Sequence, residues 1–172
     1  MNYIYSLLLI FFLTSKVNAQ YSPSAINYGI TLNKEFQSLE SAGLGLRLEY
    51  AYNCFTTYIV EYNRNHSFNE GNDSYGEFAA GINLILFNYF PTTITAGIGY
   101  IVNGDSNFEE EEDNATLFFR TGNLNHGAQI KLRALHKISS HVHLFAEANL
   151  KSLGSKYHNF LIGFNYEFNP RR

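Results

Sequence analysis

The chain has 172 residues, with 12 lysines and arginines against 15 aspartates and glutamates and a formal net charge of −3 at pH 7. This length suits one domain with one core, and a mildly acidic chain without a basic cluster is a poor candidate for binding nucleic acid. Tyrosine and phenylalanine are abundant, whereas there are only 3 prolines, a composition that favours strands over helices.

The first residues predict an exported protein. The apolar stretch from about Ile4 to Leu13 is too short to span a bilayer, and Val17-Asn18-Ala19 follows with a small residue at its last position, as in secretory signal peptides. We predict a signal peptide over residues 1–19, cleaved after Ala19, and one domain over residues 20–172. Cys54 is the only cysteine, so no disulfide framework or lipid-anchored amino terminus is expected.

Apolar residues then recur with period two in eight successive segments, which is the signature of strands and not of helices. The pattern predicts strands at 25–36, 42–52, 56–65, 75–87, 92–103, 123–137, 141–152 and 157–168. Each segment is about ten residues long, the length of a tilted membrane-spanning strand.

The two faces of these strands differ in a way that predicts which one is inside. Even positions are apolar throughout, as in Phe160, Ile162, Phe164, Tyr166 and Phe168, whereas odd positions carry glycines, amides and charges. Glycine weakens strands on a water-washed surface, but a crowded eight-stranded interior needs small residues beside long ones. We therefore predict an all-β, eight-stranded antiparallel transmembrane up-and-down barrel with the polar face inside. The alternative with reversed faces is a soluble periplasmic barrel that binds an apolar ligand.

Charges on the odd face predict ion pairs inside the barrel, because buried charges are tolerated only when paired. Residues opposite each other in a hairpin must have the same parity if one face is to stay apolar. A turn centred on Cys54 then places Arg47 opposite Glu61. In the hairpin formed by the predicted strands 123–137 and 141–152, either Lys131 or Arg133 lies opposite Glu147, depending on the register.

Connection lengths predict the orientation. Turns near 53–54, 88–91 and 139–140 are short, whereas two connections at the opposite end, 66–74 and 104–122, are long. Outer-membrane barrels have short periplasmic turns and longer extracellular loops. Both termini are therefore expected in the periplasm, and tyrosine and phenylalanine gather toward the ends of the apolar face as in interfacial aromatic girdles.

The segment GAQIKLRALHKISSHVHLFAEANLKSLGSKYHNFLIGFNYEF, Gly127 to Phe168, resembles the last three strands of the small eight-stranded outer-membrane barrels of the OmpA and OmpX type. The resemblance implies a porin-like barrel of the Gram-negative cell outer membrane, surrounded by outer-membrane lipids and inserted by the barrel assembly machinery, with no cofactor. It does not imply one activity, because this architecture carries adhesins, structural proteins, small pores and lipid-modifying enzymes.

Catalytic and metal-binding residues are not expected. A lipid A deacylase would show His-x-Ser on a strand, and none of the six histidines has serine two residues later. His126, the histidine that we place on the lipid face, has only Asn and Gly beside it. His141 and His143 share the predicted inward face but have no third ligand at a fixed spacing. A lipid A deacylase or acyltransferase is therefore the second hypothesis.

The loops carry the remaining signal, since function on such scaffolds lies in loops. An acidic run in the second long loop is expected to be solvated, with weak Ca²⁺ or Mg²⁺ capture as the alternative; it comprises Glu109, Glu110, Glu111, Glu112 and Asp113. Phe118 and Phe119 follow in a strand-forming stretch that could extend a hairpin above the membrane and present an edge to a partner. Because long interior side chains fill an eight-stranded barrel, we predict no open pore, no enzyme activity, and a structural or surface-interaction role through loops 66–74 and 104–122.

Overall fold

The computed structural model describes residues 22–36, 41–67, 74–108 and 115–168, so the predicted signal peptide lies outside the described residues. The period-two segments form strands, and the bounds are β1 Ile26–Glu35, β2 Ser41–Ala51, β3 Thr56–Ser67, β4 Tyr75–Tyr89, β5 Thr92–Asn103, β6 Phe119–Thr121, β7 Leu124–Lys137, β8 Val142–Lys151 and β9 Asn159–Phe168. A short 3₁₀ helix, η1 (Ser155–Tyr157), precedes β9. In the described part of the chain, no helix is long and apolar enough to cross a membrane.

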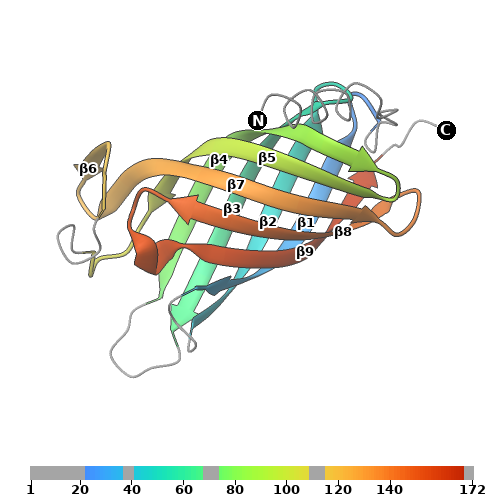
Figure 1. Cartoon of the computed structure of the whole chain (residues 1–172). Coiled ribbons are helices and arrows are strands. Elements are labelled where there is room, and N and C mark those ends of the chain that lie inside the picture. The colour runs from blue at the N-terminus through green and yellow to red at the C-terminus, as the bar shows by residue number, and fades with distance from the viewer. Residues whose placement is uncertain (1–21, 37–40, 68–73, 109–114, 169–172) are drawn as a thin grey trace, which may run out of the picture.

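The strands close into an antiparallel barrel. The order in the sheet is β5-β4-β3-β2-β1-β9-β8-β7-β6, and β5 also pairs with β7, so eight long strands form the wall and β6 is an addition to it (Figure 1). β1 pairs with β9 along its whole length, from Ile26 opposite Phe168 to Glu35 opposite Asn159. The predicted eight-stranded up-and-down barrel is confirmed, because each wall strand is bonded to its sequence neighbours and the first to the last.

The apolar face is the outside. Leu46 is 65% exposed and Ile98 68%, whereas every acidic side chain in the described ranges is buried, the members being Glu35, Glu49, Glu61, Glu77, Asp105, Glu147 and Glu167. The soluble alternative needs the reverse arrangement and is therefore wrong. An exterior of this kind is stable only where lipid, and not water, surrounds the wall.

One strand departs from the even-outward rule. β4 continues to Tyr89, two residues beyond its predicted end, and the β4–β5 register shifts between Ile85 and Phe87. Such a bulge inserts one residue and reverses the parity of those that follow. Phe87 and Tyr89 consequently lie outside, 45% and 85% exposed.

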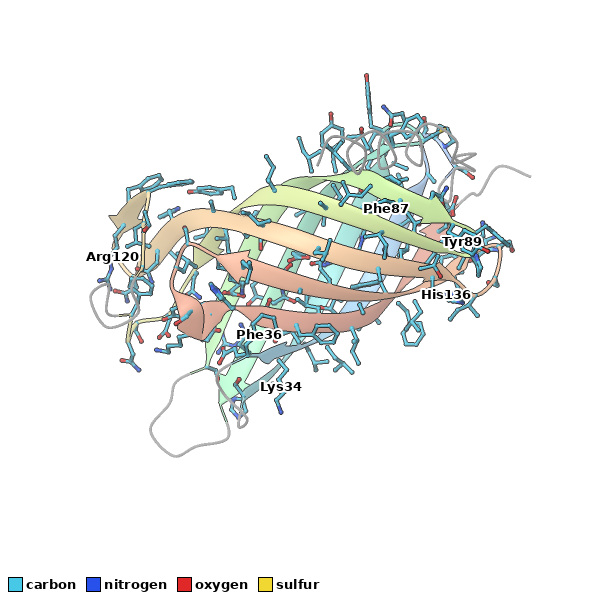
Figure 2. The ribbon with its side chains drawn as sticks, viewed as in Figure 1. Lys34, Phe36, Phe87, Tyr89, Arg120 and His136 are labelled. Carbon is cyan, nitrogen blue, oxygen red and sulfur yellow. The ribbon has the colours of Figure 1, made fainter. Side chains whose placement is uncertain are left out.

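The two ends of the barrel differ. At the end that we call the turn end lie the β2–β3, β4–β5 and β7–β8 connections, and the β6–β7 hairpin extends from the opposite end, the loop end (Figure 1). Figure 2 shows Tyr89 and His136 at the turn end and Arg120 at the loop end.

The interior is apolar at both ends and charged between them. Ala25, Ala51, Leu135 and Phe145 form the cluster near the turn end.

Candidate functional site

Four charged side chains form an alternating network across the middle of the barrel. Nη2 of Arg47, on β2, lies 2.6 Å from Oε2 of Glu61 on β3 and 2.7 Å from Oε1 of Glu147 on β8. Nζ of Lys131, on β7, lies 2.8 Å from Oε1 of Glu61 and 3.6 Å from Oε1 of Glu147. Each of the four residues is at most 3% exposed. Two cations and two carboxylates from four strands therefore neutralise one another where water is excluded.

The structure contains the predicted hairpin registers of these residues and some of the predicted ion pairs. Arg47 lies opposite Glu61 and pairs with it. β7 and β8 adopt the second of the two expected registers, with Arg133 opposite Glu147. Arg133 nevertheless directs Nη1 and Nη2 to Glu49 of β2, 2.8 Å from each carboxylate oxygen. A long side chain in a narrow barrel reaches across the lumen, which hairpin register alone does not describe.

A second buried pair lies between the central network and the loop end. Nζ of Lys151, on β8, lies 2.8 and 2.6 Å from the two carboxylate oxygens of Glu77 on β4. The side-chain amide of Asn103 donates to the same carboxylate at 3.1 Å. The lumen is thus crossed by ion pairs at more than one level, and long side chains fill the interior, as in other eight-stranded barrels.

An apolar cluster closes the interior at the loop end. Its buried members are Tyr75, Ala79, Ile101, Phe108, Leu153 and Tyr157, with Ala115 and Leu117 packed against them. The Tyr157 hydroxyl donates to Oδ2 of Asp105 at 2.8 Å, and the side-chain amide of Asn125 donates to the Asp105 carbonyl oxygen at 3.2 Å. Residues 105–108 and the start of the second described part, 115–117, therefore pack onto the mouth of the barrel.

The rest of that loop forms a hairpin that continues β7 beyond the wall. Phe119 lies opposite His126 and Thr121 opposite Leu124, and the two-residue turn begins with Gly122 at φ +60, a left-handed conformation that glycine adopts without a Cβ clash. Residues 120–123, which we call the hairpin tip, are all exposed. The predicted hairpin extension is present as β6 and the start of β7.

Phe118 and Phe119 point toward the outer wall, where they meet a histidine. The ring of Phe118 stacks on Tyr100 at 6.3 Å between centroids, and the ring of Phe119 stacks on His126 at 4.2 Å. The Tyr100 hydroxyl also hydrogen-bonds Nδ1 of His126. Sequence reasoning missed this partner because Tyr100 and His126 are far apart in the chain and adjacent only once β5 pairs with β7. A phenol is not the serine that deacylase chemistry requires.

The other histidines correct two expectations. His136 is also exposed on the outer wall of β7, hydrogen-bonded to Thr92 at 2.9 Å, so His126 is not alone on that face. His141 precedes β8 and stacks on the outward ring of Tyr166 at 5.7 Å, whereas His143 is buried in the lumen, 3.8 Å from Glu167. The shared inward face that we expected for His141 and His143 is therefore wrong. Among the residues that the structure describes, no group of three or more side chains could hold a metal ion.

The remaining loop expectations lie largely outside the described residues. These include the acidic run Glu109 to Asp113 and most of the 66–74 loop, of which only the ends are described. At those ends, Nδ1 of His66 and Oγ of Ser74 lie 2.5 Å apart.

Comparison with known proteins identifies the fold. No protein-family model and no curated protein matches the chain. Among solved structures, a de novo designed transmembrane β-barrel is similar over 86% of this chain and 98% of its own, with 14% identity and a TM-score of 0.60. The N-terminal β-barrel domain of Pseudomonas aeruginosa OprF is similar over 85% and 98%, with 8% identity and a TM-score of 0.57. Neisserial surface protein A is similar over 84% and 95%, with 11% identity and a TM-score of 0.54. The chain has the fold of the small eight-stranded outer-membrane barrels.

Proposed function

We propose that this outer-membrane-type barrel is a closed, non-enzymatic protein of the cell surface that contacts partners through its loop end, above all through the hairpin tip. In this proposal, outer-membrane lipids surround the apolar wall, the barrel assembly machinery inserts it, and the loop end faces outward from the cell. The observation that carries the proposal is the β6–β7 hairpin, which extends beyond the wall and exposes all of residues 120–123.

The interior supports a role other than transport. Buried ion pairs cross the lumen at the levels of Arg47 and Lys151, and the apolar cluster around Phe108 and Tyr157 covers its loop end. A solute would have to separate several buried ion pairs, and leaving one buried charge without its partner costs about 3–5 kcal/mol. Function on such a scaffold is more readily carried by exposed loops.

The hairpin tip offers a partner both charge and backbone. Arg120 is exposed, and its Nε donates to the carbonyl oxygen of Gly122 at 3.2 Å. Among the described strands, β6 is bonded only to β7, and in this proposal its other edge accepts a strand from a partner, the mode of recognition in which backbone hydrogen bonds supply affinity. Phe118 and Phe119 stack against the wall and hold the hairpin in place, which leaves the tip for the partner.

The test uses outer-membrane vesicles that carry either the wild-type chain or the double variant Arg120→Ala/Thr121→Ala. Their attachment is measured to surfaces coated with extracellular matrix proteins and to surfaces coated with vesicles of the same strain. We expect the tip variant to lose attachment several-fold, and Arg64→Ala, which removes an exposed arginine of β3 away from the hairpin, to retain it. Gel mobility with and without boiling checks that each variant is folded. Equal attachment of all three proteins would contradict a role for the hairpin tip.

A second candidate is the lipid-modifying enzyme, which the outward position of His126 beside Tyr100 favours. Overexpression separates the two proposals, because an enzyme of this class changes the mass of lipid A by one acyl chain, whereas a surface-interaction protein leaves it unchanged. A mass change that His126→Phe abolishes would contradict the non-enzymatic proposal.

A further inference from the structure

Exposed charge on the wall of the barrel is confined to one sector near the loop end. Among the described residues of the eight wall strands, Lys34 of β1, labelled in Figure 2, and Arg64 of β3 are the only lysine and arginine that are exposed. Each occupies the next outward position after the apolar part of its strand, which ends at Leu32 on β1 and at Tyr62 on β3. No acidic side chain in the described ranges is exposed, so the exposed charge of this part of the wall is positive.

Gly76 leaves space on the outer wall beside Arg64. It lies directly opposite Arg64 on β4, at an outward position that has no side chain to fill it. The three atoms nearest to a Cβ at Gly76 would all belong to Tyr62, with the hydroxyl oxygen at 3.0 Å. Side chains directly opposite each other start about 4.5–5.5 Å apart. The Arg64 side chain and the Tyr62 hydroxyl therefore border the same space.

More polar side chains lie one step closer to the loop end. Nδ1 of His66, on β3, is 2.5 Å from Oγ of Ser74, which precedes β4. When the hydroxyl donates to Nδ1, the neutral ring carries its proton on Nε2 and offers it as a donor. His66 lies opposite Ala42 of β2, and the β1–β2 register brings Lys34 to the same alanine. Because the alanine side chain is short, it does not separate the lysine from the histidine.

Five positions on three strands thus border one region of the wall, and we call them the basic sector. They are Lys34, Tyr62, Arg64, His66 and Gly76. A guanidinium offers a fork of N–H donors that fits two oxygens of a phosphate, an ammonium adds a second positive charge, and hydroxyl and imidazole groups add single hydrogen bonds. A phosphate monoester carries a charge of about −1.5 to −2 and three acceptor oxygens. Its charge matches the two exposed cations.

The level of the basic sector is that of lipid head groups, because the apolar band of such a barrel ends where the head groups begin. Interfacial lysines and arginines contact lipid phosphates in many membrane proteins, but a general belt of this kind surrounds the whole barrel. Here the other six wall strands carry no exposed lysine or arginine among their described residues. The arrangement is therefore that of a site on one side of the barrel.

We propose that the basic sector binds the phosphate monoester group of one outer-leaflet lipid. The guanidinium of Arg64 and the ammonium of Lys34 are the charged donors, the Tyr62 hydroxyl and Nε2 of His66 are the neutral donors, and the phosphate occupies the space at Gly76. The site goes beyond the surface contacts proposed for the hairpin tip. It takes a lipid of the protein's own membrane and leaves those contacts unchanged.

The experiment measures a preference between two lipids. The wild-type chain in a mild non-ionic detergent is mixed with equal amounts of phosphatidic acid and phosphatidylcholine that have identical acyl chains. Native mass spectrometry then identifies the lipid bound to each intact protein. Because both lipids offer the same chains to the wall, chain contacts cancel from the ratio. We expect phosphatidic acid, the monoester, to be bound in an excess of about fivefold or more.

Three variants separate the basic sector from net charge. Lys34→Gln/Arg64→Gln should bring the ratio of the two lipids close to one. Lys137→Gln/Lys156→Gln removes the same number of positive charges outside the basic sector and should keep the preference. Gly76→Val fills the space without changing the charge and should lower the preference several-fold. Gel mobility with and without boiling checks that each variant is folded.

A ratio near one for the folded wild-type chain would overturn the site, and so would an equal fall in both double variants, because net charge alone would then attract the lipid. An unchanged preference in Lys34→Gln/Arg64→Gln would also overturn it. Excess inorganic phosphate should not abolish the preference; if it does, the lipid is overturned as the source and free phosphate is the ligand. Each of these results concerns the basic sector alone, whereas a chain that fails to insert into lipid contradicts the membrane location on which the proposed function also depends.

Discussion

The inside and the outside of each strand are stabilised in different ways, and β7 shows the contrast within a few residues. Lys131 and Arg133 point inward and meet named carboxylates at 2.8 Å, whereas Ile130 and Leu132 point outward and are 60% and 54% exposed. The inward contacts are specific in partner and geometry, and the outward contacts require only an apolar surrounding. Substitutions inside the barrel should therefore change its stability through the loss of a few specific contacts. Substitutions on the outer wall should change its stability through contacts with lipid.

The largest loss of stability is expected when Arg47, the cation at the centre of the lumen, is removed. Arg47→Leu leaves the carboxylates of Glu61 and Glu147 buried with only Lys131 to neutralise both. Removing one member of a buried ion pair costs about 3–5 kcal/mol, so we expect a loss of that size in the free energy of unfolding, measured by urea titration in lipid vesicles with gel mobility as the readout. Arg64→Leu, on the exposed side of β3, should cost less than about 1 kcal/mol. Equal losses for the two variants would contradict the contrast.

A smaller effect is expected where the interior is tight but uncharged. A Cβ on Gly163 would lie 2.3 Å from the carbonyl oxygen of Ile30 and 2.8 Å from the ring of Phe145. Because that carbonyl belongs to the backbone of the neighbouring strand, it cannot move cheaply, and Gly163→Ala should cost about 1–3 kcal/mol. The same change at Gly104, where the nearest atom is 3.6 Å away, should be close to neutral. The same urea titration measures both, and a neutral Gly163→Ala would show that the wall yields more easily than the geometry indicates.

The smallest effect concerns pH at the loop end. Burial, and secondarily the charge of Lys151, lower the pKa of His158 from its ordinary value of 6.5, and Nδ1 of the neutral ring accepts a hydrogen bond from the Lys151 backbone N–H at 3.2 Å. A lowered pKa in the folded state means that the unfolded chain binds more protons below about pH 6.5, so this contribution to stability is present above that pH and is lost as the pH falls.

The corresponding measurement compares unfolding at pH 7.5 and pH 5. We expect the drop in stability between the two to be smaller in His158→Gln than in the wild-type chain, and His136→Gln, which changes an exposed histidine at the turn end, to leave the drop as it is. An identical drop in the wild-type chain and in His158→Gln would contradict a contribution of His158 to the loss of stability at low pH.

Much of the fold follows from patterns within single strands and hairpins. Much of the candidate site depends on the closure of the barrel, which brings together strands that are distant in the sequence. Period two and glycine placement predict the eight strands and the inward face, and parity within a hairpin predicts Arg47 opposite Glu61. Parity within a hairpin gives no information about the width of the lumen, so the ion pair that Arg133 forms with Glu49 across the lumen could not be predicted. Tyr100 and His126 come together only because β5 pairs with β7 across the long loop, and the bulge before Phe87 leaves no mark in the apolar pattern, since Leu86 and Phe87 are both apolar.

The central claim, that the even face meets lipid, is tested most directly by spin labels on that face. Leu46→Cys, Ile98→Cys and Ile130→Cys, each combined with Cys54→Ser, are labelled in lipid vesicles and probed by collisions with molecular oxygen, which concentrates in lipid, and with a nickel chelate, which stays in water. We expect frequent collisions with oxygen and few with nickel at all three positions. Frequent collisions with nickel, or shielding from both reagents, would contradict it.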